Sequence, residues 1–334
     1  MKVLKAFGPG DLRVVEAPVP EPGPGCVRVK VRASGICGSD KWIWNVKGPM
    51  DGVAGHEAAG AVDKLGEGVT SLATGDPVMI NNVVGCGTCP ACRAGAFVMC
   101  PRWDGSHDVG NGFGEYLIAP ARNCIKILPG LDFVDGALIP DNWGTPYAAT
   151  KRAGVAVGSD VLVNGCGPVG QAAVALAKTL GAYVLAADPV AWRRELALKN
   201  GADAALEPRE LPDAACKYTD GLGVNTVIEC SGANAAYESC LKSLRHGGCM
   251  VTVGEGGKFM FRPSDRLIRR ALSVYGTWYS TIPQAGEVMQ LALQRRINPR
   301  AFLTHTIPIE DAPKMFKSVV ECEAGVCKCM IVFG

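Results

Sequence analysis

A glycine-rich loop between a predicted strand and a predicted helix constrains the fold of this chain more than any other feature. The apolar segment VLVNGCG (161–167) runs into the hexapeptide GCGPVG (165–170), which has the pattern G-x-G-x-x-G, and the following segment 168–182 is rich in helix-forming residues. The next apolar segment ends at Asp188, 23 residues after Gly165. The glycines alone would be a weak signal, but in this context they are typical of a nucleotide-binding βαβ unit.

This loop predicts a bound dinucleotide. Small residues let the backbone approach a pyrophosphate, and the helix N-terminus offers free N–H groups to its negative charge. Asp188 can accept hydrogen bonds from both ribose hydroxyls of NAD and would repel the additional phosphate of NADP. Arg193 and Arg194 favour the opposite choice, because an arginine beside the ribose can pair with a 2′-phosphate. We favour NAD and leave NADP open.

The pattern of apolar residues divides the 334-residue chain into two kinds of segment, which suits two domains. From residue 1 to about 140, strand-like runs such as VRVKVRASGIC (27–37) alternate with turns that contain Gly and Pro, and these predict an all-β, barrel-like domain. After Trp143, strands and helices alternate through GGCMVTVG (247–254), which predicts a doubly wound parallel sheet. The remainder holds two predicted helices, 283–295 and 310–321, and a closing strand from Lys328.

Composition narrows the class of protein. Apolar residues make up 48% and charged residues 20%, as in globular proteins, and the formal net charge is only +2. There is neither a basic tract nor an acidic tail, so nucleic acid and anionic membranes are poor candidates as partners. The sequence has no apolar run of about 18 residues and no leader-like segment. We therefore expect the cytoplasm as the location.

Four of the fifteen cysteines lie within one short segment. Cys86, Cys89, Cys92 and Cys100 offer four thiolates, which suit a tetrahedral zinc with no coordination position left over, and hence a structural site. An iron–sulfur cluster is the alternative, but the last gap of seven residues does not match the usual ferredoxin spacing. The other cysteines, apart from Cys37, are scattered singly and are expected to be small buried residues.

A second possible metal site is dispersed along the chain. Cys37 lies in GICGSD, His56 and Glu57 in GHE, and Asp141 in IPDNWGT. A thiolate, an imidazole and a carboxylate suit a zinc that keeps a position open for substrate. Each residue alone would be unremarkable, since a lone GHE or a lone aspartate is most often structural.

Together these motifs resemble the medium-chain zinc alcohol dehydrogenase family. The resemblance covers essentially the whole chain and follows the family's order: GICGSD, GHE, the four-cysteine loop, GFGEY (112–116), GCGPVG and ECSG (229–232). It implies an α/β protein with a GroES-like β-barrel catalytic domain, residues 1–142 and 279–334, which carries the structural zinc loop 86–100. A Rossmann domain, residues 143–278, interrupts it, with the active site in the cleft between the two. It also implies two zinc ions per chain and a homodimer or homotetramer.

The resemblance assigns roles to single residues. Cys37, His56 and Asp141 match catalytic zinc ligands, and an acid at the third position is typical of enzymes that act on secondary alcohols and polyols. Glu57 matches an acid beside the metal that can exchange into its coordination shell, and Ser39 matches the hydroxyl that receives the substrate proton. Thr145 and Val169 match positions that press on the nicotinamide, and Arg193 one near the adenosine ribose. The expected cofactor contacts are Gly165, Gly167, Pro168, Val169, Gly170, Asp188, Arg193 and Ser231.

One position departs from the family's pattern. Many members have a histidine five residues after the zinc cysteine, and here that position is Trp42. The proton therefore needs another exit, through cofactor ribose and water, or through His107, which could equally be a solvated loop residue. Trp42, Trp103, His107 and Trp143 are candidates for substrate contact, because aromatic faces can stack on a sugar or cyclitol ring or can line an apolar pocket. Two or more of the tryptophans could instead only pack in the cores.

These observations predict a zinc-dependent oxidoreductase that transfers a hydride between a small-molecule hydroxyl and NAD. The hydroxyl is expected on a secondary alcohol, a polyol or a sugar or cyclitol, and Asp40 and Lys41 tilt the expectation toward a polyhydroxylated substrate. A zinc-free reductase of the same fold would have no use for Cys37, His56 and Asp141 together. The alternative from another class is a catalytically silent nucleotide-binding relative.

Overall fold

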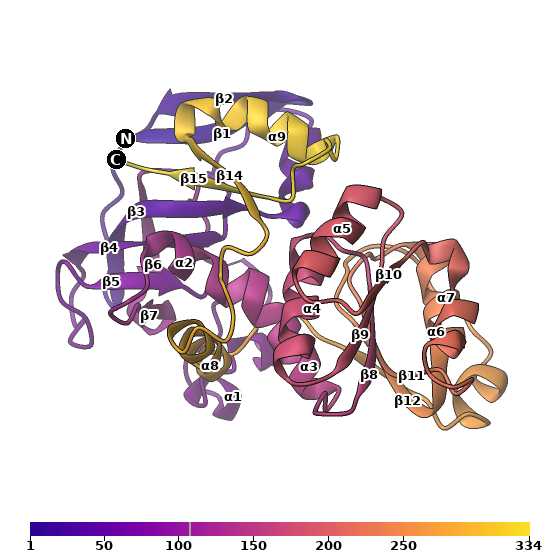
Figure 1. The fold of residues 1–334 in the computed structure, drawn as a ribbon. Helices are drawn as coiled ribbons and strands as arrows, with labels where there is room; N and C mark the ends of the chain where they lie inside the picture. Colours follow the sequence, from indigo (N-terminus) through magenta and orange to yellow (C-terminus); the bar gives the residue numbers. More distant parts are fainter. Residues whose placement is uncertain (107) are drawn as a thin grey trace. The chain divides into compact units, whose positions relative to one another are not determined.

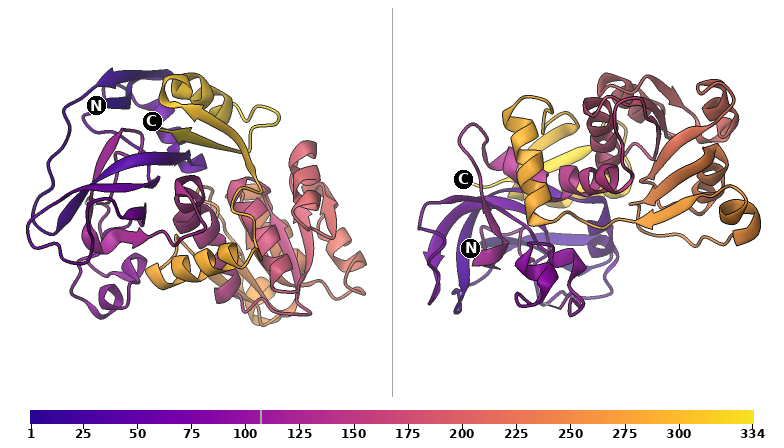
Figure 2. Two further views of the ribbon diagram at one scale, coloured as in Figure 1. Left: turned by 60° about the vertical axis from the view of Figure 1, so that its left-hand side comes forward. Right: turned by 90° about the horizontal axis from the view of Figure 1, so that it is seen from below.

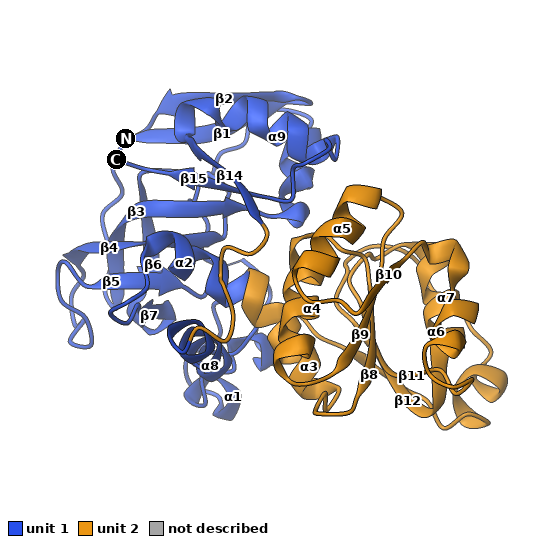
Figure 3. Ribbon diagram, in the orientation of Figure 1, with its two compact units in different colours: residues 1–141, 280–294, 303–334 blue, residues 142–279, 295–302 orange. Residues whose placement is uncertain are grey.

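The computed structural model describes residues 1–106 and 108–334, so His107 lies outside the described residues. The chain forms two compact units (Figure 3). Unit 1 comprises Met1–Asp141, Ser280–Gln294 and Leu303–Gly334, and unit 2 comprises Asn142–Tyr279 and Arg295–Phe302.

Residues 279–334 were expected to lie in one domain, whereas residues 295–302 belong to unit 2 in the structure. The indole of Trp143 explains the difference. Its Nε1 donates to the Pro299 carbonyl at 2.9 Å, and its ring lies 5.4 Å from that of Phe302. These contacts hold the segment in unit 2.

Unit 2 is built on a six-stranded sheet in which every neighbouring pair is parallel. Its strands are β8 (Asp160–Asn164), β9 (Tyr183–Ala187), β10 (Ala204–Leu206), β11 (Val224–Glu229), β12 (Leu244–Thr252) and β13 (Ser273–Gly276). Their order in space is β10-β9-β8-β11-β12-β13, so the direction of winding reverses between β8 and β11. This is the predicted doubly wound arrangement.

Helices cover both faces of this sheet (Figure 1). One face carries α3 (Gly144–Arg152), α4 (Pro168–Thr179) and α5 (Ala191–Lys199), and the other carries α6 (Asp213–Lys217) and α7 (Asn234–Ser243). Alternate residues of β8 point to opposite faces: Val161 and Val163 belong to the first core, and Leu162 to the second. Both faces are apolar because both are buried, which explains the nearly continuous hydrophobic strands of the sequence.

Unit 1 contains a seven-stranded sheet and a two-stranded ribbon. The ribbon pairs β1 (Lys2–Gly8) with β2 (Asp11–Glu16). The sheet runs β14 (Leu303–Pro308), β15 (Lys328–Val332), β3 (Cys26–Ile36), β4 (Glu57–Leu65), β5 (Pro77–Ile80) and β7 (Cys124–Lys126), with β6 (Tyr116–Pro120) paired to β3. Only the β14–β15 pair is parallel among these described strands. The closing strand β15 therefore lies beside β3, although the two are nearly 300 residues apart in sequence.

Four α-helices accompany these strands in unit 1: α1 (Pro90–Arg93), α2 (Phe133–Leu138), α8 (Ile282–Leu293) and α9 (Ala312–Val320). The views in Figure 2 show α9, in yellow, beside the indigo ribbon β1–β2. Phe316 of α9 meets Phe113 edge to face at 5.5 Å in the core beneath it. Among the described residues, no helix is both long enough and apolar enough to cross a bilayer.

Candidate metal and nucleotide sites

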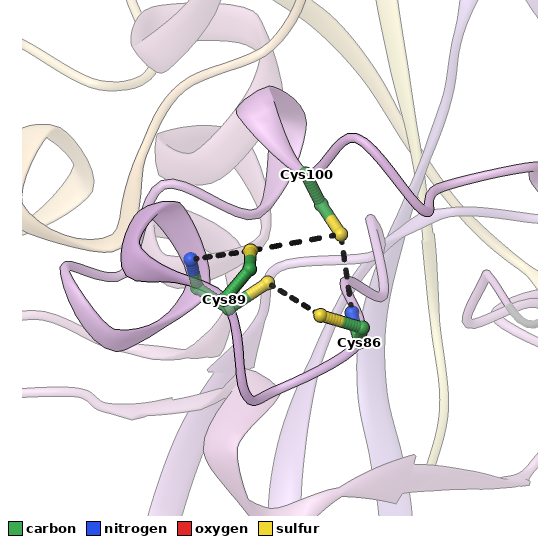
Figure 4. A group of neighbouring side chains, drawn as sticks. Cys86, Cys89 and Cys100 are labelled. Carbon is green, nitrogen blue, oxygen red and sulfur yellow. Dashed lines mark hydrogen bonds between the residues drawn. The ribbon is translucent and has the colours of Figure 1, made fainter.

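The sulfur atoms of the four clustered cysteines all lie within 4.8 Å of one another. Figure 4 shows how three of them, Cys86, Cys89 and Cys100, lie together. The Sγ atoms of Cys86 and Cys92 lie 3.8 Å apart, and those of Cys89 and Cys100 lie 4.0 Å apart. A tetrahedral zinc with Zn–S bonds of about 2.3 Å requires sulfur atoms about 3.8 Å apart. The residues present therefore fit the predicted zinc.

The surrounding backbone supports this assignment. The N–H groups of Thr88 and Cys89 lower the pKa of Cys86 to about 5, whereas burial raises the pKa of Cys92 to about 12. The N–H of Cys92 donates to Cys89 Sγ at 3.4 Å. Four thiolates this close together would repel one another, so a cation among them stabilises the group.

The dispersed residues also converge, within unit 1. Cys37 directly follows β3, and Glu57 opens the neighbouring β4 with His56 just before it. Asp141 lies in a single π-helical turn, Ile139–Trp143, that follows α2. The donor atoms of these four residues all lie within 4.8 Å of one another.

The distances within this group match those around a tetrahedral zinc. His56 Nε2 lies 3.3 Å from Asp141 Oδ2, and Cys37 Sγ lies 3.9 Å from the same oxygen. Bond lengths of about 2.0 to 2.3 Å to zinc require separations of about 3.4 and 3.6 Å. The side chains of Cys37, His56 and Asp141 thus present one sulfur, one nitrogen and one oxygen to a common point.

The electrostatics of the group favour a cation at that point. Burial raises the pKa of Cys37, and the carboxylates of Glu57 and Asp141 raise it further. Burial lowers the pKa of His56, but Asp40 and Asp141 outweigh this effect and raise it well above its usual value. Several buried acidic groups at such short range repel one another unless a positive charge lies among them.

Asp40 is a residue whose role the sequence analysis missed. It is buried, and its Oδ1 lies 3.2 Å from His56 Nδ1, while its Oδ2 accepts the Cys37 N–H at 2.8 Å. Asp40 therefore orients two of the candidate ligands, and its carboxylate is not an argument for a polyhydroxylated substrate. A signal was available, since an acid three residues after Cys37 occupies the third position of the 3-10 helix Gly38–Asn45, where it can cap the helix.

The remaining candidates in and around this site differ in exposure. Ser39 is exposed, and Trp42 is 55% exposed on the same 3-10 helix. Trp103 is 37% exposed, and its Nε1 donates to Asp108. Trp143 is fully buried in unit 2 against Phe302, which supports the alternative that it is a core residue and not a substrate contact.

The glycine loop is built for close backbone approach. Gly165 has φ +90°, and a Cβ there would lie 2.7 Å from the backbone nitrogen of Ser231. A Cβ on Gly170 would overlap the carbonyl oxygen of Gly165. Gly167 precedes α4 and Pro168 is its first residue, at the edge where the winding of the sheet reverses. This is the position at which doubly wound sheets bind nucleotides.

Asp188 follows β9 next to this loop. Its Oδ2 accepts the Cys166 N–H and its Oδ1 accepts the Val190 N–H, each at 2.8 Å, so the carboxylate is held in place by the backbone. Arg194 donates to the Asp188 carbonyl at 2.7 Å and pairs with Glu207 at 3.3 Å. Arg194 is thus engaged within the fold, which weakens one of the two arguments for NADP.

Two further predicted cofactor residues lie nearby in unit 2. The guanidinium of Arg193 lies over the Trp192 ring at 5.3 Å, and its Nε is buried without a hydrogen-bond partner among the described residues. The hydroxyl of Ser231 donates to Glu229, a fully buried carboxylate that also accepts the Ser231 N–H at 2.8 Å. Glu229, in the segment ECSG, thus holds this loop, a role that its position in the sequence does not indicate. Thr145 and Val169 lie in the first turns of α3 and α4.

Comparison with known proteins identifies the family. Residues 23–129 match the model of the alcohol dehydrogenase GroES-like domain, and residues 168–294 match that of zinc-binding dehydrogenases. The chain is 36% identical to sorbitol dehydrogenase of Gallus gallus, over 92% of this chain and 90% of that protein. It is 35% identical to L-threonine 3-dehydrogenase of Pyrococcus abyssi, over 91% and 90% respectively. The chain belongs to the zinc-dependent medium-chain alcohol and polyol dehydrogenase family. A solved NAD-dependent alcohol dehydrogenase has a similar structure, with a TM-score of 0.88, 27% identity and complete coverage of both chains.

Membership of this family confirms several predictions. The fold is a GroES-like domain with a Rossmann domain, and the enzyme oxidises a hydroxyl group of a small molecule with zinc and NAD as cofactors. The comparisons do not favour the catalytically silent alternative. The dehydrogenase thus needs a metal site and a nucleotide site, and the two residue groups described above have the chemistry for them.

Proposed function

We propose that this dehydrogenase oxidises a secondary hydroxyl that has a polar group on the neighbouring carbon, with Cys37, His56 and Asp141 holding the catalytic zinc. The observation that carries the proposal is the convergence of these three donors at distances that suit zinc. The similar proteins named for sorbitol and L-threonine act on compounds that share this chemistry, because each has a secondary hydroxyl beside a second heteroatom.

The protein's own residues have distinct tasks in the proposed reaction. When bound, zinc supplies a Lewis acid that lowers the pKa of the alcohol, and NAD supplies the hydride acceptor. Ser39, two residues after Cys37, accepts the hydroxyl proton and, being exposed, passes it to water. This route needs no histidine at the position of Trp42. Asp40 holds the His56 ring in place through Nδ1, so that Nε2 faces the metal.

The cofactor residues proposed for unit 2 follow from its geometry. The glycine loop and the N-terminus of α4 receive the pyrophosphate, and Asp188 receives the adenosine ribose hydroxyls. Arg193 lies five residues beyond Asp188 and contributes to the same end of the cofactor. Ser231 lies beside the loop at Gly165, and Val169 within the loop and Thr145 are proposed to contact the nicotinamide. NAD is favoured over NADP because Asp188 is anchored and Arg194 is engaged.

A second, structural zinc is proposed at the four cysteines, which gives two zinc ions per chain. Metal analysis of the purified protein should find close to two zinc ions, and Cys92→Ser should lose one of them and leave the loop open to proteolysis. One zinc per chain without turnover would favour the catalytically silent alternative.

Substrate class is tested with a matched panel of alcohols, each with NAD and with NADP, by the absorbance of the reduced nicotinamide. The panel contains 2,3-butanediol, 2-butanol and 1-butanol, together with sorbitol, myo-inositol and L-threonine. We expect kcat/KM to be highest for compounds with a second polar group beside the secondary hydroxyl. Turnover of 1-butanol and 2-butanol alone would overturn the substrate proposal and leave the zinc proposal standing.

We also propose a homo-oligomer in the cytoplasm. β13 is the edge strand of the parallel sheet, and Val274 and Tyr275 on it are 36% and 37% exposed, so the same edge of a second copy could pair with it. The structure describes all fifteen cysteines, and none forms a disulfide, which suits a reducing compartment. Light scattering that gives the mass of a single chain would overturn the oligomer.

A further inference from the structure

A buried serine hydroxyl is bonded to the turn that carries Asp141. Ser280 is 1% exposed, and its Oγ donates to the Pro140 carbonyl at 2.7 Å, although the two residues are 140 apart in sequence. Pro140 and Asp141 both lie in the π-helical turn Ile139–Trp143. Ser280 therefore binds the residue directly before a proposed zinc ligand.

This turn cannot be held by regular helical hydrogen bonds alone. Pro140 has no N–H to donate, and the Ile139 N–H bonds to the carbonyl of Gly136, three residues earlier. Pro140 is buried, and a buried carbonyl without a donor costs free energy comparable to a lost hydrogen bond. Ser280 supplies a donor from outside the turn and thereby fixes where the turn lies.

Ser280 is itself held from two directions within unit 1. Its main-chain carbonyl accepts from Asn81 Nδ2 at 3.2 Å, and Asn81 is 2% exposed. Two residues further on, the Ile282 N–H donates to the Gly95 carbonyl at 2.9 Å. A Cβ on Gly95 would lie only 3.1 Å from Ile282 Cβ, so the two backbones approach closely. This short segment thus joins the four-cysteine loop to the turn of Asp141.

The position of Gly95 depends on the loop that the structural zinc would close. Gly95 lies between Cys92 and Cys100, and its N–H donates to the Cys92 carbonyl at 3.0 Å. Metal binding and local folding of such a loop are coupled. Loss of the structural zinc should therefore loosen the bond from Ile282 to Gly95 and, with it, the support that Ser280 gives to the turn.

We propose that Ser280 is a positioning residue that sets Asp141 for the catalytic zinc, and that the structural zinc acts on the catalytic site through it. The inference rests on the two zinc sites of the proposed function. The path from the Gly95 carbonyl through Ile282 and Ser280 to Pro140 consists only of hydrogen bonds and short stretches of main chain. Such a contiguous network can transmit a coupling free energy between two sites.

The first test measures the metal at the catalytic site by itself. Cobalt is placed at the catalytic site and zinc at the four cysteines, and a chelator is titrated while the cobalt absorption bands are recorded. In Ser280→Ala, cobalt should bind about three- to tenfold more weakly and its bands should shift, because the turn has lost a hydrogen bond. The zinc at the four cysteines should be retained. Ser280→Thr keeps the hydroxyl and should bind cobalt within about threefold of the native protein.

A double-mutant cycle tests the link to the structural zinc. Cys92→Ser, which is expected to lose that zinc, should weaken cobalt binding at the catalytic site at least about threefold. Combined with Ser280→Ala, it should add less than about twofold to the larger single loss, because both changes break the same path. If Cys92→Ser does not fold, Ile282→Pro removes the N–H that reaches Gly95. Ile282 is the first residue of α8, where proline is tolerated, so this variant should weaken cobalt binding and keep the structural zinc.

The matched control is Ser243→Ala. Ser243 is also fully buried, and its hydroxyl donates to the Ser239 carbonyl at 2.8 Å in α7 of unit 2. This variant should change neither the cobalt affinity nor the cobalt bands. Cobalt affinity within twofold of the native protein in Ser280→Ala, or losses that multiply in the double variant, would overturn the inference. A native protein that binds no metal at the proposed catalytic ligands would instead overturn the proposed function.

Discussion

Asp40→Asn gives the sharpest test of how the zinc ligands are held. The aspartate accepts from two sides, with Oδ1 facing His56 Nδ1 at 3.2 Å and Oδ2 accepting the Cys37 N–H at 2.8 Å. An asparagine of the same shape has one acceptor and one donor, so its amide nitrogen must face one of these two N–H groups. The variant therefore loses one hydrogen bond whichever way the amide is turned, together with the negative charge beside the imidazole.

The size of the effect follows from that count. A hydrogen bond to a charged group contributes about 1.5 to 3 kcal/mol. At about 1.4 kcal/mol per factor of ten, its loss weakens zinc binding by roughly 10- to 100-fold, which is the range found for residues that support metal ligands.

The assay is competition between the protein and a chelator, read as the zinc retained at each chelator concentration. Asp51→Asn, an exposed residue just after Met50, removes the same charge away from the ligands and serves as the control. Zinc affinity within twofold of the native protein in Asp40→Asn would refute the claim that Asp40 supports the ligands. Equal losses in both variants would show a general effect of charge instead.

Three further changes probe other parts of the molecule. Asp188→Ser removes the carboxylate proposed to repel a 2′-phosphate; two unit charges at about 5 Å repel by about 3 kcal/mol at an effective dielectric of about 20. Steady-state kinetics should therefore show the ratio of NADP to NAD kcat/KM rising at least tenfold, and an unchanged ratio would contradict the role of Asp188. Trp143→Phe leaves the Pro299 carbonyl without its donor and opens space beside Phe302, so urea unfolding should show unit 2 destabilised by about 2 to 4 kcal/mol, whereas a loss below about 0.5 kcal/mol would count against that packing. Burial raises the pKa of Cys124 from 9.0 to about 12, so the native state holds this proton more tightly than the unfolded state, and stability should fall as the pH rises from about 9 to 12. Cys124→Ala should flatten that part of the pH profile, and an identical profile would disprove the assignment.

Sequence was sufficient wherever the chemistry lies in a short segment. The strand, glycine loop and helix of residues 161–182 predict the parallel sheet and its nucleotide edge, because the whole pattern lies in one continuous segment in which Gly165 and Gly170 leave no room for a side chain. The four cysteines likewise lie within one loop. Family order then related Cys37, His56 and Asp141, which no local spacing connects.

Sequence was insufficient where a role depends on what lies opposite a side chain. Asp40 resembled a free polar group until the structure showed its two N–H partners. Lys328 is a single lysine in an apolar strand, and nothing near it in the sequence indicates that β15 pairs with β3 and that Lys328 forms an ion pair with Glu57. The placement of residues 295–302 depends in the same way on contacts between distant segments, because Trp143 donates to the Pro299 carbonyl.

The interruption of unit 1 by unit 2 has a consequence for how this enzyme is made. The two strands beside β3 are β4 and β15, and the whole parallel sheet of unit 2 is synthesised between them. Unit 2 can therefore fold while unit 1 still lacks β15 beside β3. Until β15 fills that gap, Glu57 lacks its ion-pair partner Lys328. Nascent chains stalled shortly before Lys328 should therefore bind the nucleotide through unit 2 but bind zinc at the proposed catalytic site more weakly than the finished protein. Completion of the metal site is then the last step of folding.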